Sequence, residues 1–495
     1  MLSGDVGQGK LLPGSDIAAM SPPRRLRARN PRTGQQDYEF TVMSCNELAQ
    51  SVAALRRAQR GWHDAGVAAR IAALGRWQRE LRTARHAIVD ALALDTGRRR
   101  LASVELDGIL SGIDRWCAAA PDLVRTQERP SAALPHVVIE QSTDPYPVVG
   151  AISPWNFPLL LSFIDAIPAL LAGCAAFVKP SDVTPRFVVP LAASIAAVPK
   201  LDAVLRVAPG DGALGTMLIR HVDVVAFTGS VATGRKVAAS AAEALIPAYL
   251  ELGGKDAAIV LAGSDLERAA TALLRASVAA TGQACQSIER IYVHRDSFDA
   301  LVSLLVAKSH EVVLSRDPDG GDIGPFIFAR QAEIVAAQLA DAVAKGARIH
   351  TGGEIELHGG GLWMSPTVVT NVDHGMQLMQ EETFGPVMPV MAFDSVDEAV
   401  RLANDSAYGL SAAVFGPDES VTRAVARRLE AGGVSVNDAG LTTMLFETEK
   451  SAYRSSGVGP SRFGPSGLTR FLRRRSTYVN RGEVLPIQAY SEGTR

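Results

Sequence analysis

A single cysteine, Cys285, lies in the segment ATGQACQSIERIYV, in a small and mildly polar loop that leads into an alternating, strand-like run. Such a residue can be an inert core side chain, a metal ligand, half of a disulfide or a nucleophile. The other cysteines, Cys45, Cys117 and Cys174, are far from it in sequence, and the chain has no CxxC motif and no Cys/His cluster. This spacing disfavours a zinc site, so no metal is expected. Four cysteines in a long chain also fit a reducing compartment, and we expect a cytoplasmic protein.

Five other short motifs place polar or flexible residues where an apolar run ends. PWNFP holds Asn156 in a proline-bounded turn, and LELGGK has Glu251 at the end of a strand-like run. The glycines of FTGSVATG do not form a G-x-G-x-x-G or P-loop pattern, but they leave the start of a helix open to an anion. Taken singly, such residues have ordinary roles as turn caps, ion-pair partners or core. The residues of interest in the five motifs are Asn156, Lys179, Asp182, Gly229, Ser230, Gly234, Glu251, Glu382 and Phe384.

Alternating strands and helices must position these motifs. Residues 46–120 carry apolar side chains at three- and four-residue spacing, which predicts helices. From Val148 onward, short β-branched runs alternate with helical stretches, which predicts βα units and a mostly parallel sheet. A second series of this kind begins at Ala257, so we expect the boundary between two α/β lobes near Gly253–Gly254. Because the loops after parallel strands gather at one edge of a sheet, this arrangement would bring the motifs together.

Composition disfavours several other classes of protein. The chain has 495 residues, of which 47% are hydrophobic and 21% charged, and its formal net charge is −2. This length fits several lobes, and the weak net charge gives no reason to expect nucleic acid or a membrane as a partner. The apolar segment from Phe157 to Val178 contains Asp165 and prolines, so we predict a buried helix followed by a buried strand, not a membrane span. Residues 1–25 are polar, and we expect a flexible tail without the apolar core of a signal peptide.

The motifs PWNFP, KPSD, FTGS, ELGGK, GQAC and EETFGP occur in this order. The combination resembles the NAD(P)-dependent aldehyde dehydrogenase superfamily over roughly residues 30 to 480. The resemblance implies an α/β fold with a Rossmann-like cofactor domain, an α/β catalytic domain and a small oligomerisation strand pair. We expect the cofactor domain at 26–253, with bridging strands at 133–147, the catalytic domain at 254–445, and a C-terminal return and oligomerisation segment at 446–495. It also implies a homodimer or homotetramer joined through the segments HVVIEQSTDPYPV and RSTYVN.

Within this resemblance, Cys285, Glu251 and Asn156 would be catalytic. The thiolate of Cys285 would attack an aldehyde, and the Asn156 amide and the backbone N–H of Cys285 would stabilise the oxyanion of the thiohemiacetal. Loss of hydride to the nicotinamide would leave a thioester, and Glu251 would deprotonate the water that hydrolyses it to a carboxylate. Burial that raises the pKa of this glutamate would suit it to the task. Two alternatives stay open: a CoA-acylating dehydrogenase, which the retained Glu251 disfavours, and a non-catalytic binding protein with the same fold.

The resemblance also implies a nicotinamide cofactor. Asp182 stands where many members have a glutamate that binds the adenosine ribose. A carboxylate there should repel a 2′-phosphate, so we expect NAD, with NADP as the alternative. Gly229 and Ser230 would meet the pyrophosphate, and Glu382 would hold the nicotinamide ribose. The residues carried over to the cofactor site are Ile152, Pro154, Trp155, Lys179, Asp182, Gly229, Ser230, Gly234, Glu382 and Phe384.

The motifs define the substrate side less well. The residues expected to line it are Phe157, Leu161, Ile164, Ala284 and Gln286. The first three are apolar, which favours a small-molecule aldehyde with an aliphatic or aromatic body. Arg454 or another arginine could still bind a carboxylate tail. Near the C-terminus many members carry a PFGGxKxSGxGR-like segment, whereas this chain reads MLFETEKSAYRSSGVGPSRFGPSG and keeps only fragments, such as Lys450, so the identity of the aldehyde stays open.

Overall fold

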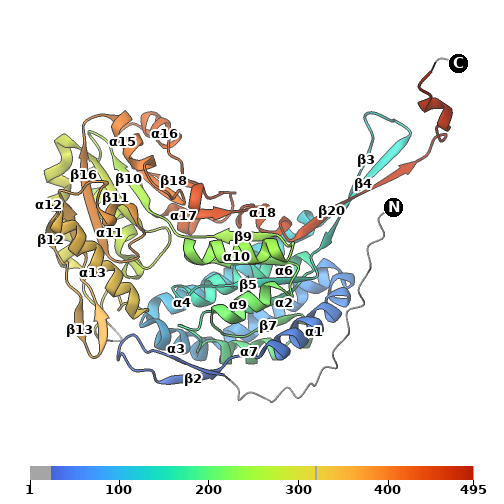
Figure 1. The fold of residues 1–495 in the computed structure, drawn as a ribbon, viewed down its shortest axis with the longest axis horizontal. Coiled ribbons are helices and arrows are strands. Elements are labelled where there is room, and N and C mark those ends of the chain that lie inside the picture. Colours follow the sequence, from blue (N-terminus) through green and yellow to red (C-terminus); the bar gives the residue numbers. More distant parts are fainter. Residues whose placement is uncertain (1–23, 318–319, 494–495) are drawn as a thin grey trace, which may run out of the picture.

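Two lobes, each built on a mostly parallel β-sheet flanked by helices, make up the body of the molecule (Figure 1). The computed structural model describes residues 24–317 and 320–493, so the expected tail, residues 1–25, lies outside the described part of the chain except for its last two residues. A narrow three-stranded sheet projects away from the body. The α/β architecture expected from the alternating runs is confirmed.

The first sheet has six strands in the order β19-β9-β8-β5-β6-β7, and all neighbours run parallel except β19, which is antiparallel to β9. The C-terminal part of the chain supplies β19 and so closes one edge of this sheet. The strands are β5 (Val148–Ile152), β6 (Ala175–Lys179), β7 (Leu205–Val207), β8 (Val224–Thr228), β9 (Ala248–Glu251) and β19 (Gly457–Val458). The helices between them are α5 (Pro158–Phe163), α6 (Ala166–Ala172), α7 (Val188–Ala196), α8 (Pro199–Asp202), α9 (Gly212–Ile219) and α10 (Val231–Glu243).

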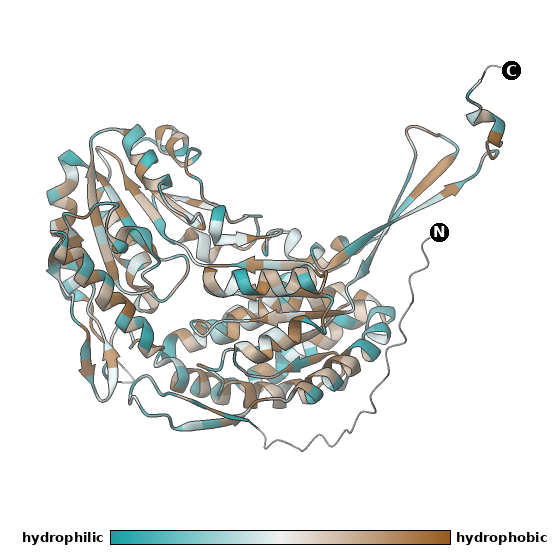
Figure 2. Cartoon of the chain, viewed as in Figure 1, coloured by the Kyte–Doolittle hydropathy of each residue, from teal (hydrophilic) through white to brown (hydrophobic). Residues whose placement is uncertain are grey.

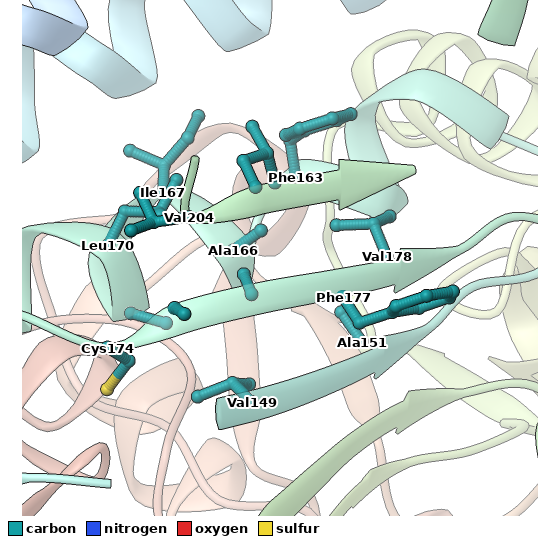
Figure 3. Packing of buried hydrophobic residues seen from close by; sticks show 14 of the residues in the cluster. Val149, Ala151, Phe163, Ala166, Ile167, Leu170, Cys174, Phe177, Val178 and Val204 are labelled. Carbon is teal, nitrogen blue, oxygen red and sulfur yellow. The ribbon is translucent and has the colours of Figure 1, made fainter. Parts of the chain in front are cut away.

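The centre of this sheet is apolar on both faces. Strands β5, β6 and β8 are buried along their whole length, as expected for parallel strands covered by helices. On β6, Val178 points to the side where Phe163 of α5 lies and Phe177 to the opposite side, and both belong to the same apolar core as Ile167 of α6 (Figure 3). Colouring by hydropathy shows the same concentration of apolar residues in the strands (Figure 2). A rigid central sheet of this kind fixes the loops at the carboxyl ends of its strands.

Four long helices precede the first sheet, in the region expected to be helical. A capping box starts the first of them, because Ser44 accepts a hydrogen bond from the backbone of Glu47 while the Glu47 carboxylate accepts from the backbone of Ser44. Gly97 ends the third with a left-handed conformation (φ 69°). The helices are α1 (Cys45–Asp64), α2 (Gly66–Thr83), α3 (Arg85–Thr96) and α4 (Arg99–Leu123).

The apolar segment from Phe157 to Val178 departs from the expected single helix and strand. It forms two short helices, α5 and α6, before β6. The break has a covalent cause: Pro168 has no N–H to donate to the carbonyl of Ile164, so α5 does not continue, and Pro168 lies in the first turn of α6, where that N–H is not needed. Asp165 lies at the break, buried and in contact with two arginines. None of the described helices is long and apolar enough to cross a membrane.

The second sheet has seven strands in the order β12-β15-β16-β11-β10-β17-β18, parallel except for the β12–β15 pair. The strands are β10 (Asp256–Val260), β11 (Ile288–His294), β12 (Arg348–Thr351), β15 (Thr367–Thr370), β16 (Val387–Phe393), β17 (Ser411–Phe415) and β18 (Gly433–Val436). Its helices are α11 (Leu266–Val278), η1 (Ala279–Gly282), η2 (Arg295–Ser297), α12 (Phe298–Glu311), α13 (Ala329–Ala344), α14 (Gln377–Gln380), α15 (Val396–Asn404), α16 (Glu419–Ala426) and α17 (Leu441–Met444). The sheets change over between Glu251, the end of β9, and Asp256, the start of β10.

The projecting sheet joins two segments that the sequence singled out as strands. β20 (Leu472–Asn480) runs antiparallel to β4 (Val137–Pro145), which also pairs with β3 (Gln127–Pro130). Both segments are strands, and they pair with each other. Eight of the nine residues of β20 are exposed to solvent. The remaining small elements are β1 (Arg25–Ala28), β2 (Tyr38–Thr41), β13 (Glu356–His358), β14 (Gly361–Trp363), η3 (Arg454–Ser456), α18 (Ser466–Thr469) and η4 (Ile487–Tyr490).

Candidate active site

A cavity of about 1110 Å³ lies at the carboxyl ends of the first sheet's strands and is bordered on its other side by residues of the second lobe. It combines motifs that are far apart in the sequence. Of the residues proposed from the sequence, it is lined by Ile152, Pro154, Trp155, Asn156, Leu161, Lys179, Asp182, Gly229, Ser230, Cys285, Glu382 and Phe384. Phe157, Ile164, Gly234, Glu251, Ala284 and Gln286 are not part of its lining.

The loop that carries Cys285 is tightly constrained. Residues 280–282 have consecutive left-handed conformations, with φ values of 57°, 62° and 67°. A Cβ atom at Gly282 would lie 2.1 Å from the carbonyl oxygen of Gly385, so only glycine fits there. The buried side chain of Gln283 also fixes the loop, because it hydrogen-bonds to the backbone carbonyl of Pro325 and the backbone N–H of Ile327. The half-buried thiol thus lies at a fixed position on the cavity wall.

The surroundings of Cys285 favour the neutral thiol. Burial, reinforced by the carboxylates of Glu382 and Asp256, raises the pKa of Cys285 to about 12, while Arg462 acts in the opposite direction. The thiolate is the nucleophilic form of cysteine. The side chain must therefore lose its proton as it reacts, and a positive charge brought into the cavity would assist that loss.

Asn156 is held next to the cysteine loop. Its buried side chain donates a hydrogen bond from Nδ2 to the carbonyl of Gln283, with an N–O distance of 3.0 Å. The guanidinium of Arg98 donates both to the backbone carbonyl of Asn156 and to that of Ala280. This arginine also lies over the ring of Phe157, 5.1 Å from its centroid. Arg98 therefore ties the asparagine turn to the cysteine loop, a link that no local sequence pattern indicates.

Glu251 is the last residue of β9. The next two residues, Leu252 and Gly253, line the cavity. Its backbone pairs with Gly457 of β19, so the C-terminal segment fixes the strand that carries it. The Glu251 side chain is 22% exposed, and its Oε1 lies 3.7 Å from Nε of Arg462. The carboxylate is thus neither fully buried nor engaged in a short hydrogen bond to that arginine.

Opposing influences set the basicity of Glu251. Burial raises its pKa, Arg462, Arg470 and Lys450 lower it, and the nearby carboxylate of Asp165 raises it again. The net result is a pKa above the ordinary value, as expected for a carboxylate that acts as a base near neutral pH. The same charge also acts on Cys285, since Glu251 contributes to the raised pKa of the thiol.

One end of the cavity carries Lys179 and Asp182. The buried ammonium of Lys179 donates to the carbonyls of Pro180 and Gly210, and burial lowers its pKa to about 8. Asp182 remains half-exposed in the lining. This end therefore presents a carboxylate next to a lysine that is already occupied by backbone carbonyls.

The middle of the cavity is formed by the start of α10. Ser230 caps this 13-residue helix by accepting a hydrogen bond from the backbone N–H of Thr233 at 3.3 Å. Gly229 donates its N–H to the carbonyl of Glu251, so it contributes a lack of side chain and not a free donor. Gly234 packs against Leu252, and a Cβ atom there would lie 2.4 Å from that side chain. The role of Gly234 is therefore close packing of helix against strand, away from the lining.

The other end of the cavity carries Glu382 and two aromatic rings. Glu382 accepts a hydrogen bond from the backbone of Gly254 at 3.3 Å, and burial, with the nearby Glu289, raises its pKa to about 8. Phe384 has a left-handed backbone (φ 54°), and its ring meets Trp155 edge-on at 5.5 Å. The buried carboxylate of Glu289 accepts a hydrogen bond from the backbone N–H of Phe384 and so holds this unusual conformation in place.

The side expected to receive substrate is only partly assembled from the proposed residues. Leu161 alone among them lines the cavity. Phe157 is stacked against an arginine, as described above, and Ile164 lies at the end of α5. Ala284 and Gln286 are half-buried on either side of the cysteine. The apolar face of α5 thus reaches the cavity through one side chain.

The arginine suggested as a carboxylate partner lies elsewhere. Arg454 pairs with Glu430 and donates to the carbonyls of Asn404 and Ser406, and it is not among the residues of the cavity wall. Lys450 and Arg462 are the cations whose charges reach the thiol. The ammonium of Lys450 donates to a backbone carbonyl and lies 4.4 Å from the centroid of the Phe463 ring, within electrostatic range of Cys285.

A match to known proteins supplies the family. The model of the aldehyde dehydrogenase family matches residues 18–477 of the chain. The chain belongs to the aldehyde dehydrogenase family. The family resemblance and the aldehyde dehydrogenase-like fold expected from the sequence are thereby confirmed, and the protein is an enzyme of this class.

Individual relatives differ in what they act on. A Mycolicibacterium smegmatis protein assigned as an NADP(+)-linked succinate-semialdehyde dehydrogenase is 36% identical over 456 residues, which cover 91% of this chain and 87% of that one. The 4,4'-diapolycopene aldehyde oxidase of a Methylomonas species is 34% identical over 471 residues, or 93% and 86% of the two chains. Among solved aldehyde dehydrogenases, the protein assigned as PutA of Anabaena variabilis has a TM-score of 0.92 at 50% identity and covers 94% of this chain and 99% of its own.

Proposed function

We propose that this aldehyde dehydrogenase oxidises an aldehyde to a carboxylate with NAD, through a thiohemiacetal and a thioester on Cys285. The observation that carries the proposal is the single cavity that connects Cys285 and Asn156 with Asp182 at one end and Glu382 near the thiol. A nucleophile, an oxyanion donor and a site long enough for a dinucleotide are therefore continuous. Neither a buried structural cysteine nor a simple binding cleft requires that combination.

The residues present fit a nicotinamide dinucleotide. Asp182 and Glu382 offer carboxylates to ribose hydroxyls at the two ends, and the N-terminus of α10 favours the pyrophosphate between them. Trp155 and Phe384 border the end next to the thiol. When bound, the cofactor supplies a hydride acceptor. The half-exposed carboxylate of Asp182 disfavours a 2′-phosphate, so we propose NAD as the better cofactor, with NADP as the alternative.

The protein's own groups perform the remaining steps. Cys285 loses its proton to water in the cavity, and its sulfur forms a bond to the aldehyde carbon as the C=O π bond opens, while the Asn156 amide and the backbone N–H of Cys285 stabilise the charge on oxygen. After oxidation, the carbonyl carbon is held to sulfur as a thioester. Glu251 takes a proton from water, the oxygen of that water bonds to the carbonyl carbon, and the C–S bond breaks to return the sulfur as thiolate. The product is a carboxylate.

For the substrate we propose an aldehyde with an apolar aliphatic or aromatic body. Leu161 is apolar and lines the cavity, and the nearby segment 446–463 brings the aromatic pair Phe446 and Phe463 toward Lys450. The relative that acts on diapolycopene aldehyde supports an apolar substrate, whereas the succinate-semialdehyde relative represents the acidic alternative. A comparison of kcat/KM for an aromatic aldehyde and succinic semialdehyde decides between them, and a clear preference for the acid would contradict the proposal.

The decisive experiment follows the absorbance of the reduced cofactor with a panel of aldehydes, with and without CoA. Wild type, Cys285→Ala and Glu251→Gln are compared with Cys117→Ala, which removes a cysteine far from the cavity. We expect oxidation without CoA in wild type and in the control, and its loss in the two site variants. Activity that requires CoA would instead indicate an acylating enzyme. Cofactor binding without any turnover would indicate a non-catalytic protein.

Assembly and location are proposed on other grounds. β20 presents a long exposed edge to solvent, and we propose that it joins protomers into a homodimer or homotetramer. Light scattering of the wild-type protein and of Tyr478→Pro measures this, because the backbone N–H of Tyr478 faces the open edge of β20 and proline removes it. All four cysteines are free, which supports a reducing compartment such as the cytoplasm.

A further inference from the structure

Next to the proposed base lies a buried group of charges that the reaction described so far does not use. Asp165, at the break between α5 and α6, forms ion pairs with Arg462 and Arg470, and all three side chains are almost completely buried. Arg462 also donates to the hydroxyl of Thr228, the last residue of β8, at 2.6 Å. Two cations and one anion leave one positive charge uncompensated within the group. The nearest carboxylate outside it is that of Glu251, at 3.7 Å from Arg462.

The guanidinium of Arg462 has different surroundings at its terminal nitrogen and at Nε. One terminal nitrogen is engaged by Asp165 at 2.8 Å and by Thr228, which fixes the guanidinium plane. Its Nε, on the side of Glu251, is buried and has no hydrogen-bond acceptor within range. Burial opposes the charge, yet Asp165 and Glu251 raise the pKa of Arg462. The cation is therefore permanent, and it cannot donate or relay a proton itself.

The distance to Glu251 suits a base better than a short ion pair would. A bidentate arginine would occupy both carboxylate oxygens with hydrogen bonds. At 3.7 Å the charge still favours the ionised form, while the oxygens keep their lone pairs for a water proton. Lys450 and Arg470 also act on the Glu251 carboxylate, but Lys450 is held by Phe463 and a backbone carbonyl, and Arg470 is engaged by Asp165.

We infer that Arg462 is a positioning residue for the proposed hydrolysis: anchored by Asp165 and Thr228, it holds the Glu251 carboxylate ionised beside the cysteine without occupying it. The inference rests on the proposed function, in which Glu251 deprotonates the hydrolytic water. Arg462 touches neither the cofactor residues nor the thiol, so its effect reaches the reaction only through charge and orientation. The groups that face the Glu251 carboxylate and share control of its titration are Arg462, Arg470, Asp165, Lys450 and Cys285.

The sign of the effect on pH dependence follows from the charge. Removal of a neighbouring cation raises the pKa of a carboxylate, and the ionised base then exists only at higher pH. In Arg462→Met we expect the acid limb of kcat to move up by about one pH unit, so that activity at a pH on that limb falls by about tenfold and recovers in more alkaline buffer. Arg462→Lys keeps the charge and should hold the limb close to that of wild type.

Rapid-mixing measurements of reduced cofactor separate the two chemical stages. In Arg462→Met, hydrolysis of the thioester should become slowest, so a burst of one reduced cofactor per active site precedes slow turnover. Arg428→Met, which removes an exposed arginine paired with Asp397, should leave both the burst and the pH profile unchanged. If Arg462→Met folds poorly in a thermal melt, Thr228→Val provides the test, because it removes one anchor and keeps the charge; a smaller shift of the same sign is expected.

Each outcome bears on the inference. A uniform loss of activity at every pH, with no burst, would mean that Arg462 only supports the fold, and the inference would be wrong. An unshifted acid limb while Glu251→Gln is inactive would also overturn it but leave the proposed function intact. Full activity of Glu251→Gln without CoA would overturn both, since Glu251 would then not be the base.

Discussion

The two sides of the cavity are built in different ways. Most of the cofactor side is made of residues at the end of, or just after, strands β5, β6 and β8, while Glu382 and Phe384 come from the second lobe. The side around Glu251 depends on segments far apart in the chain: Asp165 after α5, Arg462 near the C-terminus, and the pairing of β9 with β19. The first side is therefore mostly local in sequence. The second exists only when the whole chain is folded.

The largest expected difference between these sides is in stability. Asp165→Asn leaves the guanidinium groups of Arg462 and Arg470 buried without their carboxylate, which should cost about 3–5 kcal/mol. Asp144→Asn, which breaks the exposed pair with Arg475, should cost about 0–1 kcal/mol. Urea unfolding of both variants measures the two costs, and equal values would mean that the buried pairs of Asp165 contribute no more to stability than an exposed pair of the projecting sheet.

A second prediction concerns the residue that joins the two sides. Asn156→Ala removes the proposed oxyanion donor and should lower kcat by about 10²–10³-fold, since that is the usual effect of losing one such donor. The affinity for NAD should change little, because the side-chain amide donates toward the cysteine loop. Single-turnover rates and NAD titration test both parts. A large loss of NAD affinity with normal turnover would place Asn156 on the cofactor side.

A third prediction uses the thiol itself. Because the pKa of Cys285 is raised to about 12, its thiolate fraction should grow about tenfold for each pH unit above neutrality without levelling off. Alkylation by iodoacetamide, followed by mass spectrometry of the Cys285 peptide and corrected with Cys285→Ala, measures this rate. A plateau below pH 9 would indicate that the buried carboxylates do not control the thiol in solution.

The smallest predicted effect tests the cofactor side. Asp182→Ala removes the carboxylate that should repel a 2′-phosphate, and the ratio of kcat/KM for NADP to that for NAD should rise by about tenfold or less. Glu39→Ala, which removes an exposed carboxylate of β2 at the same formal charge change, serves as the control. If both variants alter the ratio equally, the preference arises from overall charge and not from Asp182.

The cofactor side and the side around Glu251 also differ in how far the sequence predicts them. The strands of the first sheet, the helix at α10 and the cofactor motifs follow from local periodicity and turn residues, and the structure contains them at the expected places. The break between α5 and α6 at Asp165 could be predicted only from Pro168, because its missing N–H cannot bond to the carbonyl of Ile164. Strand β16 was obscured by Pro389 within it, a residue that normally disfavours a central strand.

The charged group around Asp165 could not be derived from the sequence in the same way. Arg462 lies in the divergent segment and Arg470 just after it, and their side chains meet Asp165 only through tertiary structure. The same is true of Arg98, whose contacts with Asn156 and Ala280 come from a helix well before both. A buried aspartate in an otherwise apolar segment was the one available signal, because such a charge requires a partner.

The edge position of β19 has a consequence for how the enzyme comes into being. During synthesis the cofactor strands, the cysteine loop and Glu251 all leave the ribosome before Gly457 and Arg462 do. Domains fold as the chain emerges, N-terminal parts first. A nascent chain can therefore form its nucleotide cleft and display its thiol while the strand that bears the base still lacks its neighbour. Completion of the C-terminus would then supply β19, the neighbour of the strand that carries the proposed base.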